Sequence, residues 1–184
     1  MPVLEQEPSA WPPDLFESEN ALGENRRWCV YHVRPRSEKM VARQLRSRGV
    51  PHFLPQYERR QRYQRRLVQS YLPLFPGYVF VVGNENDAGG AVDLKELVAV
   101  LKVDDQRQIE SELRNIHFLL RAGLPVTRED RLQPGSLAKI VSGPLAGLCG
   151  QVIKNRQGLR FVLRVQFLQQ GVSLEVDGSM IEAL

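Results

Sequence analysis

The chain has 184 residues, of which 42% are hydrophobic and 25% charged, enough for one domain of ordinary size or two small ones. No apolar run is long enough to cross a membrane, and the N-terminus lacks the basic and apolar regions of a signal peptide, so we expect a soluble, cytoplasmic protein. Cys29 and Cys149 lie far apart without metal-ligand spacing, which argues against a disulfide framework or a zinc site.

Charge is distributed unevenly along the chain. Residues 1–25 contain six acids and no base, whereas residues 26–66 contain thirteen Lys or Arg against two acids, Glu38 and Glu58. So much positive charge in one segment indicates a polyanion as partner, with a generically basic, solvated surface as the alternative.

The acidic segment, residues 1–25, is rich in proline and has no periodic apolar pattern, so it is expected to be a disordered tail. Within it lies a candidate short apolar contact motif made of Trp11, Leu15 and Phe16. One hypothesis based on its charge is that this tail folds back on the basic segment and competes there with nucleic acid.

The basic segment begins with a predicted strand, residues 28–33, and a predicted helix, residues 38–48, with Ser37 as N-cap and Gly49 as C′ residue. Four basic residues recur at helical spacings: Arg36, Lys39, Arg43 and Arg46. The helix should therefore pack its apolar face on a sheet and present a basic stripe on roughly the opposite side.

A second strand is predicted over residues 51–57, followed by a protruding basic hairpin or loop over residues 58–70, which has almost no apolar residue to bury before Leu67. Its arginines are interleaved with tyrosine and glutamine: Arg59, Arg60, Arg62, Arg65 and Arg66. Arg and Tyr neutralise phosphates and stack on bases, and Gln bonds base edges. This composition indicates nucleic acid without distinguishing DNA from RNA.

An apolar stretch, residues 72–82, combines a Pro-rich bend with a predicted strand over residues 77–82. Alternation places the aromatic Tyr78 and Phe80 on one face of this strand and two valines on the other. Two interpretations stay open for the aromatic face: part of the core, as most apolar stripes are, or a docking surface for a partner.

The sequence then predicts a short helix over residues 91–97, a strand over residues 98–103 and a helix over residues 109–122, which complete an α+β domain spanning residues 26–122.

A polar segment that starts with chain breakers, residues 123–132, is a candidate linker. Four short strands separated by turn residues come next, at residues 136–141, 150–155, 159–168 and 172–177. Four or five such strands within about 50 residues suggest a small β-barrel over residues 133–184.

The chain resembles the NusG family of transcription elongation factors at landmarks that occur in the family's order. The amino-terminal landmarks are Trp28-Cys29-Val30-Tyr31 and Phe75-Pro76-Gly77-Tyr78. Residues 134–140 and 143–152 resemble the signature of the family's KOW domain, an SH3-like barrel. The resemblance extends from about residue 27 to residue 184 and implies an antiparallel sheet flanked by helices, followed by such a barrel.

The resemblance also implies partners. In this family the amino-terminal sheet packs on the clamp helices of RNA polymerase, for which the implied contacts are His32, Phe75, Pro76, Tyr78 and Phe80. The basic surface would face upstream duplex or non-template DNA through Arg34, Arg36, Lys39, Arg43, Arg46 and the five hairpin arginines. Phe167 and Leu168 fall where the family places a loop that contacts ribosomal protein or termination factor; the alternative is that one of them fills the barrel.

Residues 72–76, Leu-Pro-Leu-Phe-Pro, look more like the RfaH-type specialised antiterminators than the Phe-rich motif of general NusG proteins. That similarity implies recruitment through a signal in the non-template strand. Gly77 instead matches the general pattern. Position 72 also lacks the acid with which the specialised form holds its two domains together, so a helix-to-barrel fold switch is not implied.

An enzyme is the least supported class, because His32, His52 and His117 have no nucleophile or carboxylate constellation around them. We expect neither cofactor nor metal. The main hypothesis is an elongation or antitermination factor that binds the polymerase clamp, suppresses pausing or termination and associates with the nucleoid during transcription. The alternative is an RNA-binding, ribosome-associated or translational KOW protein.

Overall fold

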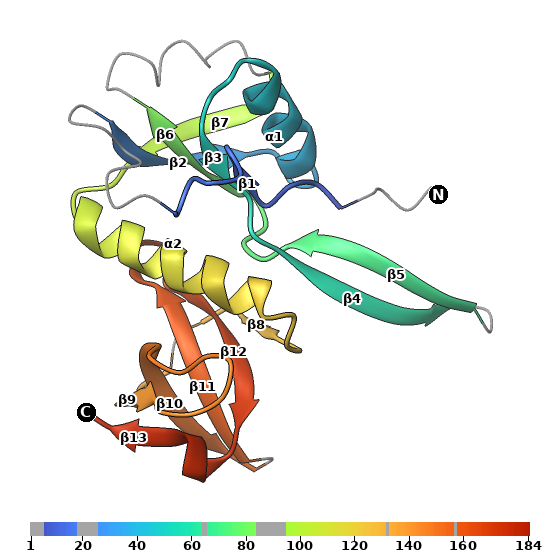
Figure 1. Cartoon of the computed structure of the whole chain (residues 1–184). Coiled ribbons are helices and arrows are strands. Elements are labelled where there is room, and N and C mark those ends of the chain that lie inside the picture. The colour runs from blue at the N-terminus through green and yellow to red at the C-terminus, as the bar shows by residue number, and fades with distance from the viewer. Residues whose placement is uncertain (1–5, 18–25, 64–65, 84–94, 132, 157) are drawn as a thin grey trace. The chain divides into compact units, whose positions relative to one another are not determined.

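The computed structural model describes residues 6–17, 26–63, 66–83, 95–131, 133–156 and 158–184 (Figure 1). The chain forms two compact units that divide between Gln106 and Arg107, whereas the sequence places a boundary in residues 123–132. Antiparallel sheets dominate both units.

The first unit is built on a five-stranded antiparallel sheet. In spatial order its strands are β1 (Ala10–Trp11), β3 (His52–Phe53), β6 (Tyr78–Gly83), β2 (Arg27–Val33) and β7 (Leu97–Lys102). The strands predicted at residues 28–33, 77–82 and 98–103 are confirmed to within about a residue at each end. The short helix predicted at residues 91–97 falls mostly outside the described residues, and Leu97 opens β7.

The central strand β6 is buried on both faces. On one face, Val79 and Val81 pack in a cluster with Val41, Ala42 and Leu45 of α1 (Glu38–Ser47). On the other face, rings form a chain of edge-to-face and tilted contacts, with centroids 5.7 Å apart for Phe75–Phe80 and 6.4 Å for Phe53–Phe80. The core interpretation of the aromatic face is therefore correct for Phe80.

The amino-terminal segment is not a disordered tail over its described part, residues 6–17. β1 pairs with β3, with Ala10 opposite Phe53, and the backbone N–H of Leu54 donates to the carbonyl of Ser9 at 2.7 Å. Leu15 and Phe16 are buried. The prediction of disorder was wrong here because composition registers proline and acid but not a pairing with a strand some forty residues later. Residues 1–5 and 18–25 lie outside the described part.

The strand predicted over residues 51–57 is interrupted. β3 ends at Phe53 and β4 (Gln56–Tyr63) begins after Leu54 and Pro55, because Pro55 has no N–H to continue a ladder. β4 pairs with β5 (Arg66–Pro73), so the basic segment is a hairpin rather than a loop.

Helix α1 begins at the predicted residue and ends one residue earlier than predicted, and two side chains at its start have notable environments. Ser37 occupies the N-cap without a side-chain hydrogen bond. Glu38, in the first turn of the helix, is buried, and its Oε1 accepts a 2.6 Å hydrogen bond from the backbone N–H of Gly77. Gly49, with φ of 68°, is the left-handed residue that ends the helix.

The second unit contains a six-stranded antiparallel sheet and most of α2 (Gln106–Arg121), the helix predicted at residues 109–122. In spatial order its strands are β13 (Ile181–Ala183), β9 (Ser136–Ile140), β10 (Cys149–Asn155), β11 (Gly158–Val165), β12 (Gln170–Val176) and β8 (Thr127–Glu129). β8 lies within the candidate linker: the Ser173 hydroxyl donates to its Glu129 at 2.5 Å and accepts from Arg160.

Three details of the second unit differ from or sharpen the sequence prediction. The strand predicted to end at residue 168 stops at Val165 and continues as a 3-10 turn, η1 (Gln166–Leu168). A second 3-10 turn, η2 (Gly178–Met180), precedes β13, which the sequence pattern did not reveal. Two glycines of the second unit have distinct roles: Gly147 has a φ of 99°, and a Cβ on Gly150 would lie 2.7 Å from the carbonyl oxygen of Val162.

Candidate nucleic-acid interface

The β4–β5 hairpin is a polar ribbon whose strands pair only with each other in the described part of the chain, and it projects from the first unit (Figure 1). Directly opposed residues share a face, so Arg59, opposite Ser70, lies on one face, while Arg60 and Arg62 lie on the other. All three arginines are exposed. Positive charge is thus presented on both sides of the ribbon.

The hairpin arginines differ in how they are paired. Arg60 forms an ion pair with Glu58, whereas Arg59 and Arg62 make no ion pair with any residue that the structure describes. Arg66 opens β5, but its side chain lies outside the described part, as does the whole of Arg65. Arg59 and Arg62 are therefore the hairpin residues best placed to meet phosphates.

The predicted basic stripe on α1 is only partly a solvent-facing surface. Arg34 and Arg36 are exposed in the turn before the helix, as expected. Lys39 is buried, contrary to the prediction. Burial lowers the pKa of Lys39, and the negative charge of Glu7 opposes that shift.

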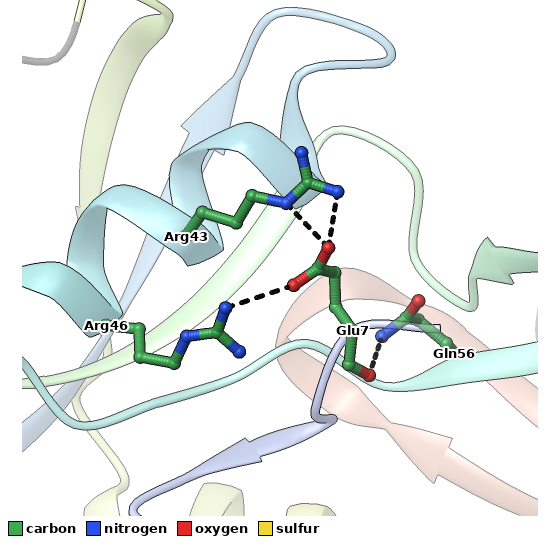
Figure 2. A network of polar contacts seen from close by, with 4 residues as sticks. All are labelled: Glu7, Arg43, Arg46 and Gln56. Atoms are coloured by element: carbon green, nitrogen blue, oxygen red, sulfur yellow. Dashed lines mark hydrogen bonds and ion pairs between the residues drawn. The ribbon is translucent and has the colours of Figure 1, made fainter. Parts of the chain in front are cut away.

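Arg43 and Arg46, one turn apart on α1, converge on the carboxylate of Glu7 (Figure 2). The Nε and Nη2 atoms of Arg43 lie 2.6 Å and 2.5 Å from Oε1, and Nη2 of Arg46 lies 3.6 Å from Oε2. The stripe thus carries an anion supplied by its own chain.

The predicted polymerase contacts separate into a buried and an accessible group. Phe75 and Phe80 are fully buried, so neither ring is available to a partner, and their expected role as surface contacts is corrected to that of core support. Pro76 is exposed, and Tyr78 and His32 are half-buried.

His32 and Tyr78 form one aromatic pair at the surface. They are opposed on β2 and β6, and their rings stack with centroids 5.3 Å apart. The turn before Tyr78 is held by the bond from Gly77 to the buried Glu38, and the N–H of Val33 donates to the Gly77 carbonyl at 2.8 Å. The backbone on both sides of the pair is therefore fixed.

In the second unit, Phe167 and Leu168 lie in the turn η1. The Phe167 side chain is exposed and Leu168 is half-buried, so Phe167 offers apolar surface and does not fill the core. The backbone N–H of Gln166 donates to Glu112 at 3.0 Å, and Gln169, with φ of 54°, closes the turn.

Two acids at the interface escaped the sequence analysis as individual residues. Glu7 was counted only as part of an acidic tail, and Glu38 only as one of the two acids in the basic segment. The excess of acid before the basic segment did signal an internal pairing, but no local pattern identified Glu7 as the residue that makes it.

Neither a metal centre nor a membrane span is indicated. Within the described ranges no three His, Cys, Asp or Glu side chains gather as metal ligands would. In the same ranges, neither helix is both long and apolar enough to cross a bilayer.

Comparison with known proteins adds to this description of a sheet-based protein with an arginine-rich surface. The family model described as transcription termination factor nusG matches residues 26–117, half of the chain. The chain belongs to the NusG family, a family of transcription factors.

Two solved structures are similar over most of their length. One, of domain interaction in Thermotoga maritima NusG, shares 22% identity, with 85% of this chain and 96% of that chain covered and a TM-score of 0.46. The other, MjSpt4:Spt5 complex conformation B, shares 13% identity over the same fractions, with a TM-score of 0.26. Because both scores lie below 0.5, the functional assignment rests on the family match alone. No curated protein sequence matched the chain.

Proposed function

We propose that this NusG-family protein is an elongation or antitermination factor that binds the clamp of RNA polymerase through its first unit and suppresses pausing or termination. It acts in the cytoplasm on the nucleoid, without a catalytic step of its own. The observation that carries the proposal is the family match over the unit in which the stacked His32–Tyr78 pair is held at the surface.

The polymerase contact is assigned to the accessible aromatic residues. Tyr and His offer an apolar ring with a polar edge, which suits a surface that is wet in the free protein and covered in the complex. Phe75, next to Pro76, and Phe80 are buried and pack edge to face, so they support the turn from the core.

The nucleic-acid contact is assigned to the hairpin. Arg59 and Arg62 are exposed on opposite faces of a ribbon that has no apolar layer to bury, an arrangement suited to tracking a phosphate backbone. Upstream duplex or the displaced non-template strand is the proposed ligand. Recognition of a signal in that strand, as in RfaH-type factors, is the specialised form of the proposal.

Residues 133–184 of the second unit are proposed to be a KOW-like module that follows the candidate linker, residues 123–132. Exposed Phe167, in a turn closed at both ends, supports a contact with a ribosomal protein or a termination factor.

A transcription run tests the proposal. Purified chain is added to elongation complexes on a template with a pause site and an intrinsic terminator, and RNA lengths are measured over time. We expect shorter pause dwell times or more read-through. Unchanged RNA products, together with tight binding of the full chain to ribosomal RNA, would favour the ribosome-associated alternative.

A further inference from the structure

The pairing of Glu7 with α1 differs from an ordinary surface ion pair in its burial. The Glu7 side chain is 9% exposed, whereas those of Arg43 and Arg46 are 46% and 37% exposed. The acid is thus enclosed while its partners still reach solvent, and Figure 2 shows both guanidinium groups pointing at the two carboxylate oxygens.

The backbone around Glu7 is fastened independently of its charge. The side-chain amide of Gln56 donates to the Glu7 carbonyl at 2.9 Å, and the β1–β3 pairing begins three residues later (Figure 2). Further on, Phe16 stacks near Trp28 with centroids 5.9 Å apart and meets Phe53 edge-on at 5.0 Å. The packing of residues 6–17 on the first unit therefore positions the Glu7 carboxylate beside the two arginines.

Arginine forks bind carboxylate and phosphate by the same parallel N–H donors. Arg43 and Arg46 stand at positions i and i+3 of one helix, reach solvent and bind the same anion. This arrangement suits a contact to a nucleic-acid phosphate. We propose that Arg43 and Arg46 form a phosphate-binding site that the Glu7 carboxylate occupies in the free protein, so that these arginines join nucleic-acid binding only when that carboxylate no longer pairs with them. This inference rests on the proposed function.

The docked amino-terminal segment would reduce nucleic-acid binding by the cations of α1 more than binding by those of the hairpin. Lys39 is also covered beside Glu7, so three of the cations predicted on the stripe are withheld together, while Arg59 and Arg62 stay accessible. The free protein should then bind nucleic acid without Arg43 and Arg46, and should gain their contacts once the Glu7 carboxylate no longer pairs with them.

The test compares two single substitutions that remove the same charge from the same segment of the full chain. Glu7→Gln keeps the size of the side chain and removes the negative charge that pairs with both arginines. Asp14→Asn is the matched control, because Asp14 is exposed and makes no ion pair with any residue in the described part of the chain. Thermal unfolding of each variant verifies that the segment stays docked.

Binding of each protein to a labelled DNA duplex is measured between about 50 and 200 mM salt. Two added phosphate contacts steepen the slope of log K against log salt by about 1.8 for Glu7→Gln. The affinity advantage of Glu7→Gln over the wild type should then shrink about twelvefold across that range. Asp14→Asn should keep the slope of the wild type. Adding Arg43→Ala and Arg46→Ala to Glu7→Gln should remove the gain.

The outcomes separate the two proposals. If Glu7→Gln and Asp14→Asn behave alike while the wild type binds the duplex, the gated phosphate site is refuted and the hairpin interface stands. The gated site is equally refuted if the gain survives loss of both arginines. If neither the wild type nor any variant binds duplex or single-stranded DNA, the nucleic-acid interface is refuted and the gated site with it.

Discussion

At the scale of single residues, the surface aromatic pair depends on one glycine and one buried acid. Gly77 has a φ of 82°, a left-handed conformation that side chains disfavour, and its N–H is satisfied by Glu38. A Cβ on Gly77 would lie 3.6 Å from the Val33 carbonyl oxygen and 3.7 Å from Cδ2 of His32, so there is space for a methyl group. The requirement for glycine therefore comes from the backbone.

Gly77→Ala is expected to lower the free energy of unfolding by about 1–2 kcal/mol through this backbone strain. Gly49→Ala is the matched control, because Gly49 has a φ of 68° and a Cβ built on it would have no atom of the aromatic pair within 4 Å. Urea unfolding should give similar losses for the two variants, whereas only Gly77→Ala should weaken polymerase binding. Wild-type stability of Gly77→Ala would show that the turn does not need the left-handed conformation.

At the scale of elements, the amino-terminal segment belongs to the first unit's fold. Its short strand extends the sheet, Leu15 is buried, and Phe16 packs against Phe53 and Trp28. Local periodicity predicted β2, β6, β7 and both helices because their signals are contained in consecutive residues. It missed β1 because a two-residue strand has no period and owes its existence to β3.

Leu15→Ala tests this docking against Leu67→Ala, the same chemical change at a hairpin position that is 70% exposed. Loss of a buried leucine side chain should cost about 2–5 kcal/mol, and loss of the exposed one less than about 0.5 kcal/mol. Unfolding in urea is monitored by tryptophan fluorescence, because both tryptophans, Trp11 and Trp28, lie in the first unit. Equal, small losses would mean that residues 6–17 contribute nothing to the stability of the first unit.

At the scale of the whole molecule, the order and composition of the residues predicted an α+β part with a basic hairpin, followed by a run of short strands. It could not predict which functional side chains stay accessible, because that depends on what the rest of the chain covers. Phe80 and Tyr78 share a face of β6, yet Phe80 is sealed by Phe75 and Phe53 while Tyr78 remains half-exposed beside His32. Likewise, Lys39 and Arg43 share a helix, and only the position of Glu7 shows that both are engaged.

The most direct test of polymerase binding uses the accessible pair rather than the buried rings. Core RNA polymerase is titrated onto immobilised full-length chain carrying His32→Ala and Tyr78→Ala, with Leu137→Ala, an exposed leucine of the second unit, as control. Loss of a central aromatic contact costs about 2 kcal/mol or more, so the dissociation constant should rise by about 30-fold, while the control binds like the wild type. Wild-type affinity in the folded double variant, or no polymerase binding by the wild type, would contradict the proposed polymerase contact.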